Sequence, residues 1–217
     1  MTLFSSLLSR VSKDGKESIR GNYKPKKHPR GSSRHTMRKS LKKNLAGGTV
    51  LKESVKCPDG EDENEWIAVN TIEIFNTMNM CYSFIQGFCT EASCPQMTGA
   101  KATYLWTDGK GKPQELSAPQ YIDNLVNWIS EQIDNPEIFP VDDSDFPKNY
   151  RPAVIKIISR VLRVYAHIYH AHWEHIQKLD CYQHTNTSLK HLQYFAEHFS
   201  LIGEKDLAVM KHVFDTL

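Results

Sequence analysis

The stretch RPAVIKIISRVLRVYAHIYHAHWEHI, residues 151–176, decides the fold of this chain. Its apolar side recurs at intervals of three and four, which is typical of a helix that buries one face: Val154, Ile157, Ile158, Val161, Leu162, Tyr165, Ile168, Tyr169 and His172. The other side carries Arg160, Arg163 and His167, which helical spacing stacks along one edge. Histidines crowd the last turns, at positions 167, 170, 172 and 175. The stretch therefore predicts a core helix with a basic edge and a histidine-rich end.

The charge divides the chain into two parts. The 217 residues, 40% of them hydrophobic, suffice for one large domain or a domain with an arm. Residues 1–56 hold 15 Lys and Arg against 3 Asp and Glu, whereas residues 57–217 hold 12 against 22. These net charges of +12 and −10 predict a basic, largely flexible N-terminal arm at 1–56 and an acidic helical domain at 57–217. They also suggest that the arm closes over an acidic face.

Composition excludes several classes of protein. No apolar run is long enough to span a membrane, and the N-terminal residues do not resemble a signal peptide. Five cysteines at uneven spacing argue against a disulfide framework and favour a reducing compartment, the cytoplasm or the nucleus. Nucleic acid is an unlikely partner, because the basic arm holds almost no aromatic residues to accompany its charges.

Four more segments show helical spacing: from the acidic run at 59–65 to about residue 86, and residues 117–133, 189–199 and 207–217. Ser117 and Gln120 form a capping box with a proline in the first turn. The sequence DGKG at 108–111, between residues 104–107 and 115–116, predicts a hairpin turn. We therefore expect an all-α helical bundle with a four-helix core and one small β-hairpin.

A metal site is suggested by Cys89 and Cys94, a C-x4-C pair in a loop. Thiolates suit zinc, and a closed tetrahedral site needs two more ligands from the histidine-rich helix end. The helical spacing does not decide which ones. The pairs 167/170 and 172/175 each share a face, whereas His167 and His172 lie about 140° apart on an ideal helix. They could bind one ion only by straddling the helix edge or through a local distortion.

The sequence contains no nucleophile motif, phosphate loop or carboxylate pair that indicates an enzyme. Four protein ligands would leave zinc no open position for a substrate, so we predict that the protein is not an enzyme. A hydrolytic site would require that only three ligands bind. Outside the metal site, Glu61, Glu65 and Glu73 are predicted to share one side of the first helix, where they form a solvated face or a surface for a basic partner.

Several ordered strings resemble the Mob kinase-activator family, and within it the founding, Hippo-pathway type. They are GED-x-NEWIAVNT (60–71), FCTEASCP (88–95), SAP-x-YID (117–123), FPKN (146–149), RVYAHIYH-x-H (163–172) and LKHLQYF (189–195). The resemblance covers about residues 57–202. It implies a helical bundle stabilised by one structural Zn²⁺ ion, and it assigns as ligands Cys89, Cys94, His167 and His172.

The resemblance also implies two binding surfaces. Members of the family are not enzymes. They bind the basic N-terminal segment of NDR/LATS-type AGC kinases through an acidic surface, matched here by Glu61, Glu65 and Glu73 with Trp66 beside them. They also bind phosphothreonine peptides of Ste20-like upstream kinases in a basic pocket, matched here by Arg160 and Arg163.

This chain departs from the family pattern at the phosphopeptide pocket and in the arm. A third cation of the pocket, a lysine in animal members, is replaced by Ser159. A lost charge-assisted contact of about 1.5–3 kcal/mol would weaken phosphate binding. Two threonines that the upstream kinase phosphorylates in animal relatives fall at Asn22 and Asn44, so that route of control is expected to be missing or relocated.

Two functions from different classes follow. The first is a non-catalytic co-activator that binds a kinase of the NDR/LATS type and docks an upstream phosphoprotein. The second is a scaffold or trafficking adaptor in kinase or phosphatase complexes, without kinase activation. For either, we expect the cytoplasm as the location, and the nucleus or spindle pole as further sites.

Overall fold

The computed structural model describes residue 30 and residues 48–99, 102–107, 111–141 and 144–217. In this part of the chain the helices are α3 (Gly48–Ser54), α4 (Glu63–Ser83), α5 (Ala118–Asp134), α6 (Tyr150–Ala171), α7 (Trp173–Lys178), α8 (Tyr182–His198) and α9 (Glu204–Phe214). The prediction of a predominantly helical protein is confirmed. Most of the predicted arm (residues 1–29 and 31–47), including Asn22 and Asn44, lies outside the described residues, and the predicted closure of the arm stays a prediction.

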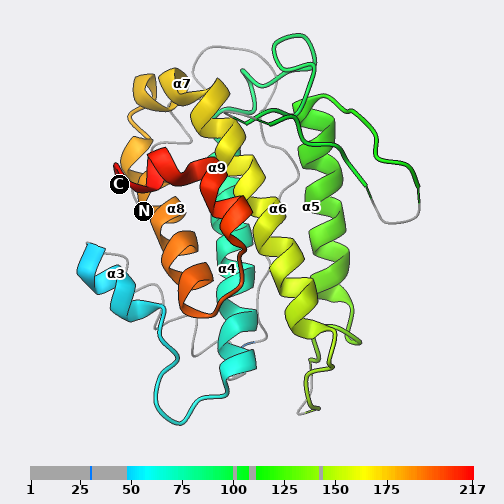
Figure 1. The fold of residues 1–217 in the computed structure, drawn as a ribbon, viewed down its shortest axis with the longest axis vertical. Coiled ribbons are helices and arrows are strands. Elements are labelled where there is room, and N and C mark those ends of the chain that lie inside the picture. Colours follow the sequence, from blue (N-terminus) through cyan, green and yellow to red (C-terminus); the bar gives the residue numbers. More distant parts are fainter. Residues whose placement is uncertain (1–29, 31–47, 100–101, 108–110, 142–143) are drawn as a thin grey trace.

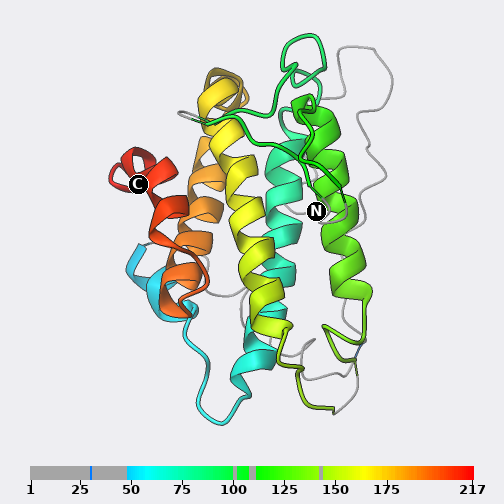
Figure 2. The same cartoon turned by 45° about the vertical axis from the view of Figure 1, so that its right-hand side comes forward.

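The long helices α4, α5, α6 and α8 run side by side along the long axis of the molecule (Figures 1 and 2). Helix α6 contacts both α4 and α5, and α4 also packs on α8. The shorter helices cover this group, since α3 packs on α8 and α9 packs on α6. Within the described ranges, no helix has the length and apolarity needed to cross a membrane.

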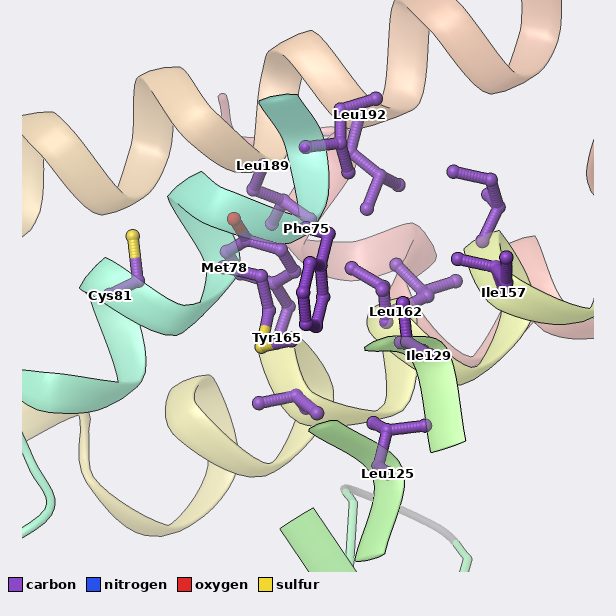
Figure 3. Close-up of a cluster of buried hydrophobic side chains, with 14 of the residues drawn as sticks. Phe75, Met78, Cys81, Leu125, Ile129, Ile157, Leu162, Tyr165, Leu189 and Leu192 are labelled. Atoms are coloured by element: carbon purple, nitrogen blue, oxygen red, sulfur yellow. The ribbon is translucent and has the colours of Figure 1, made fainter. Parts of the chain in front are cut away.

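The core lies between these helices and contains side chains from each of them. Figure 3 shows a cluster drawn from α4, α5, α6 and α8, which includes Phe75, Met78, Leu125, Ile129, Ile157, Leu162, Tyr165, Leu189 and Leu192. All of these side chains are buried. The apolar face predicted for the 151–176 stretch is therefore the face around which the bundle closes.

Capping side chains mark the first residues of α4 and α5. The Asp62 side chain accepts a hydrogen bond from the Glu65 backbone N–H at 2.9 Å, and two glutamates lie in the first turn of α4. These negative charges stabilise the positive end of the helix dipole. Glu61 precedes the helix, so it does not share one helical side with Glu65 and Glu73 as the spacing predicted. At α5, Ser117 accepts from the Gln120 N–H at 3.4 Å, as predicted.

The helix predicted over residues 151–176 is interrupted at His172. Its φ of −130° and ψ of 12° are not helical, and they separate α6 from α7. The His172 N–H still bonds to the Ile168 carbonyl at 3.0 Å, so the chain turns without losing the last hydrogen bond of α6. The prediction of one continuous helix is wrong at this point. The break changes the direction in which His172 leaves the backbone.

Two further segments differ from expectation. Helix α3 lies inside the range predicted as arm. Its Leu51 is buried, as is Val55, which directly follows the helix. In the predicted hairpin, the described residues form one isolated antiparallel bridge between Trp106 and Gln114, whose two N–H···O bonds are both 2.8 Å long. Residues 108–110 of the turn are outside the described ranges, so the hairpin stays a prediction.

Acid should destabilise the bundle through His191 on α8. This side chain is 4% exposed, and burial lowers its pKa from 6.5 to about 4. Between those values the unfolded chain binds the proton that the folded chain excludes, so stability falls as pH drops below 6.5. We expect a loss of about 2 kcal/mol between pH 7.5 and 5. Urea unfolding at both pH values measures it.

The contribution of His191 is isolated by comparing His191→Gln with His212→Gln, which removes an exposed histidine on α9. The first variant should lose about 2 kcal/mol less than the wild type on acidification, and the second should match the wild type. Equal pH dependence in all three proteins would contradict this role for His191.

Candidate metal centre and flanking surfaces

Four predicted ligands meet at one end of the bundle. Cys89 and Cys94 lie in the loop that follows α4, His167 is in the last turns of α6, and His172 is at the break after α6. All four are buried, and their ligand atoms lie within 4.8 Å of one another. This is the one such group that the described residues contain, and it could hold a metal ion.

The distances within the group suit a tetrahedral ion. Cys89 Sγ is 3.4 Å from His167 Nε2, and Cys94 Sγ is 3.3 Å from His172 Nε2. Zinc–sulfur and zinc–nitrogen bonds of about 2.3 and 2.1 Å place neighbouring ligand atoms about 3.3–3.8 Å apart. The two cysteine–histidine separations therefore already match the edges of such a tetrahedron.

Hydrogen bonds outside the group orient its members. His167 Nδ1 donates to the Thr98 carbonyl at 2.9 Å, which leaves the lone pair of Nε2 directed at Cys89. The cysteine loop is held by Ser93, whose hydroxyl donates to the Phe88 carbonyl at 2.6 Å and accepts from the Thr90 N–H at 2.9 Å. The Ala118 N–H donates to the Cys94 carbonyl at 3.0 Å and ties this loop to the start of α5.

In the absence of a cation, burial favours the neutral forms of Cys89, His167 and His172. Burial, with a smaller contribution from the neighbouring Cys94, raises the pKa of the Cys89 thiol to about 12. Burial also lowers the pKa of His167, and it lowers the pKa of His172 to about 4, where the two neighbouring histidines add to the effect. A divalent cation would displace the thiol protons, so its affinity should rise with pH.

The other two histidines of this helix end are not part of the group. His170 is exposed, and His175 stacks on Phe88 with ring centroids 4.2 Å apart. The non-helical backbone at His172 is the local distortion that lets residues 167 and 172, rather than an i, i+3 pair, face one point.

The predicted acidic surface is only partly exposed. Glu61 is exposed, whereas Glu65 and Glu73 are half-buried. Trp66 is 2% exposed, and its indole N–H donates to the Val55 carbonyl at 2.9 Å. The structure thus places Trp66 in the core, where it anchors the segment after α3 beside the glutamates. A direct contact between Trp66 and a partner is not available in this conformation.

The two arginines of the predicted phosphate pocket, here called the arginine edge (Arg160 and Arg163), differ in environment. Arg160 is 5% exposed, and its guanidinium lies 4.8 Å from the centroid of the Trp106 ring and 4.2 Å from that of Trp128. Its Nη2 donates to the Thr107 carbonyl. Arg160 therefore ties the 102–107 segment to α5 and α6.

Arg163 is half-buried and lies one turn further along α6. Its Nη1 donates to the Tyr121 hydroxyl at 3.1 Å, and its guanidinium lies 5.3 Å from the centroid of the Tyr104 ring. Its Nε has no hydrogen-bond partner among the described residues. Ser159, one turn earlier, donates to Asp206 Oδ2 at 2.9 Å. Of the two arginines, Arg163 is the better placed to bind a ligand.

The fold and the site together define a helical bundle closed at one end by a buried group of two cysteines and two histidines. A sequence model of the Mob1/phocein family matches residues 42–210, and the chain belongs to this family.

The relatives cover nearly the whole chain. "MOB kinase activator-like 1A" of Arabidopsis thaliana is 42% identical over 90% of this chain and 93% of its own length. "MOB kinase activator-like 1 homolog A" of Dictyostelium discoideum has the same identity and coverage. "Maintenance of ploidy protein mob1" of Schizosaccharomyces pombe is 39% identical over 90% of this chain and 94% of its own. Two of these names describe regulators of kinases rather than catalysts, in agreement with the prediction that the chain is not an enzyme.

Several participants in these sites were not predicted from the sequence. Trp106, Trp128 and the Thr107 carbonyl enclose Arg160, and Asp206 reaches Ser159 from α9. Each comes from a segment distant in sequence from α6. The spacing of the arginines along α6 contains no signal for them.

Proposed function

We propose that this protein is a non-catalytic kinase co-activator that binds the basic N-terminal segment of an NDR/LATS-type AGC kinase. The observation that carries the proposal is the similarity over 90% of the chain to proteins named kinase activators. The absence of an enzyme motif in the sequence agrees with it.

The metal group supports a structural role within this function. Two thiols and two imidazoles are the ligands that zinc prefers, and four protein ligands fill its tetrahedral shell. Cys89, Cys94, His167 and His172 would therefore hold one Zn²⁺. Zinc, when bound, would crosslink the loop after α4 to the end of α6. That link would fix the bundle end rather than activate a substrate.

The acidic side of the protein supports a basic partner. Glu61 and Glu65 lie at the start of α4, where carboxylates can meet Lys and Arg side chains in charge-assisted contacts. Asp59 and Asp62 lie in the same segment and extend the negative charge, whereas Glu63 is paired with Arg151. A kinase segment rich in Lys and Arg would be attracted to this surface before it makes close contact.

The double variant Glu61→Lys, Glu65→Lys tests the kinase contact. It should weaken binding of an NDR/LATS-type kinase segment at least about 30-fold, since two charge-assisted contacts become repulsive. Isothermal titration with the full chain measures the affinity. The matched control is Glu174→Lys, Glu204→Lys, which changes the charge equally at exposed positions on α7 and α9 and should retain wild-type affinity.

If the Glu61, Glu65 variant binds as tightly as the wild type, the kinase contact is wrong and the scaffold or adaptor function is favoured. A loss of the same size in both variants would show that net charge alone governs the interaction.

We further propose that the arginine edge docks a phosphoprotein, of which a Ste20-like upstream kinase is the expected example. The support is that Arg163 is half-buried, whereas Arg160 is enclosed by two indole rings. Arg160 contributes by fixing the wall of this site through Trp106 and Thr107. The cytoplasm, with the nucleus or the spindle pole as further locations, is proposed as the place of action.

A further inference from the structure

Helix α9 brings a carboxylate to the arginine edge. Asp206 lies in the first turn of α9, and its Oδ2 accepts a hydrogen bond of 2.9 Å from the Ser159 hydroxyl on α6. Ser159 and Arg163 are four residues apart and so lie on the same side of α6. The contact therefore holds a negative charge beside the α6 turn that precedes Arg163.

Tyr104 shows that both charges act on the same place. Burial raises the pKa of its hydroxyl, and the positive charge of Arg163 opposes this rise. Tyr121 and, to the smallest extent, the negative charge of Asp206 add to the rise. The Tyr104 ring also lies against the Arg163 guanidinium, at 5.3 Å from its centroid. A ligand that binds Arg163 beside this ring would thus experience the field of Asp206.

The net positive charge that the arginine edge offers to a ligand is smaller than the sequence suggests. Arg160 is 5% exposed between two indole rings and donates to a backbone carbonyl. Arg163 is the more accessible cation, and the Asp206 carboxylate is held at Ser159, one turn earlier on α6. A phosphothreonine carries a charge of about −1.5 to −2 at neutral pH, whereas a glutamate carries −1. Repulsion by a fixed carboxylate grows in proportion to the charge of the ligand.

We infer that Asp206, held by Ser159, is a specificity-determining residue of the arginine edge that selects against doubly charged phosphate ligands relative to singly charged carboxylate ligands. This inference rests on the docking role proposed above. Asp206 does not abolish anion binding, because Arg163 keeps its charge and its orientation by Tyr121. Asp206 reduces the gain in affinity that a ligand obtains when it is phosphorylated.

The variant Asp206→Asn removes this charge and keeps the size of the side chain. Binding is measured by titration of the full chain with a phosphothreonine peptide and with the same peptide carrying glutamate instead. Affinity should rise about 20-fold for the phosphopeptide and about 5-fold for the glutamate peptide, because the repulsion that is removed is about twice as large for the dianion. Both gains should shrink at high salt.

Glu204→Gln is the matched control. Glu204 is exposed in the same turn of α9, and two residues of helical rotation direct it away from Asp206. It removes the same charge and should leave both affinities unchanged. Equal gains from Glu204→Gln and Asp206→Asn would overturn the inference, as would an Asp206→Asn protein that binds both peptides as the wild type does or gains equally for both.

Arg163→Ala separates this inference from the docking role on which it rests. Added to Asp206→Asn, it should abolish the gained affinity, and a gain that persists would overturn the inference. If Arg163→Ala alone weakens phosphopeptide binding while Asp206→Asn changes nothing, docking at the edge stands and the role of Asp206 is wrong. If Arg163→Ala alone leaves phosphopeptide binding unchanged, the docking role itself is wrong, and the inference is overturned with it.

Discussion

Replacement of Cys89 by serine is expected to lower the free energy of unfolding by more than about 4 kcal/mol under zinc-replete conditions. A ligand present at about 1,000 times its Kd stabilises the folded state by about this amount, and a serine hydroxyl does not replace a thiolate on zinc. Loss of such an ion would also release the loop after α4 from His167 and His172. Removal of zinc from the wild type by a chelator should give a similar loss.

Thermal unfolding and metal analysis measure this effect. A loss of this size in a chain of 217 residues corresponds to a fall in Tm of about 10–15 °C. Cys57→Ser is the matched control, because Cys57 lies outside the metal group and should retain both one zinc per chain and the wild-type Tm. One zinc per chain in Cys89→Ser, or equal Tm values with and without chelator, would contradict a structural metal at this position.

Arg160→Ala should cost about 3 kcal/mol of stability, whereas Arg163→Ala should cost about 1 kcal/mol. Removing the buried Arg160 side chain opens a space between Trp106 and Trp128 and takes away the Nη2 donor of the Thr107 carbonyl. Arg163 is half-buried, and its loss removes one hydrogen bond to Tyr121. The larger effect is therefore assigned to the residue that is less able to reach a ligand.

Denaturant unfolding of both variants measures the difference, and near-ultraviolet circular dichroism reports the environment of the two indoles. Arg160→Lys is the informative comparison. It keeps the charge but not the planar guanidinium that lies against the rings, so it should recover only part of the lost stability. If Arg160→Ala and Arg163→Ala destabilise equally, the enclosure of Arg160 does not distinguish the two residues.

The helical class and the core face of α6 could be predicted because periodicity reports directly on burial. The positions predicted on the core face of 151–176 are buried wherever they lie in α6, except for the half-buried Tyr169. The start of α8 was placed too late. Residues 182–188 are mostly polar, so the apolar pattern begins only at Leu189. Helix α3 was missed because seven residues contain too few apolar positions to show a period.

The four residues of the metal group show where residue spacing no longer predicts the directions of side chains. The separation of His167 and His172 predicts divergent side chains only if the helix continues, and it ends at Ala171. That end depends on the meeting of α6, α7 and the cysteine loop, which are set by long-range packing. The resemblance to a family supplied the ligand set that periodicity could not.

Residue spacing was also insufficient to predict the environment of the arginine edge and of the acidic surface. Helical spacing says which residues share a side of α6, but not that indoles from two distant segments cover one of them. The resemblance to the family placed Trp66 beside a binding surface, whereas its side chain is in the core. Exposure of a large side chain depends on what packs above it, and a local string of residues does not contain that information.

Besides the rings of Tyr104 and Trp106, two main-chain carbonyls attach the chain between α4 and α5 to α6, that of Thr98 to His167 and that of Thr107 to Arg160. Every amino acid has such a carbonyl, so these two attachments do not depend on the side chains at 98 and 107. In related chains, substitutions at these two positions should therefore be better tolerated than insertions or deletions between them. The number of residues separating the two carbonyls, more than their identity, is what natural selection would be expected to preserve.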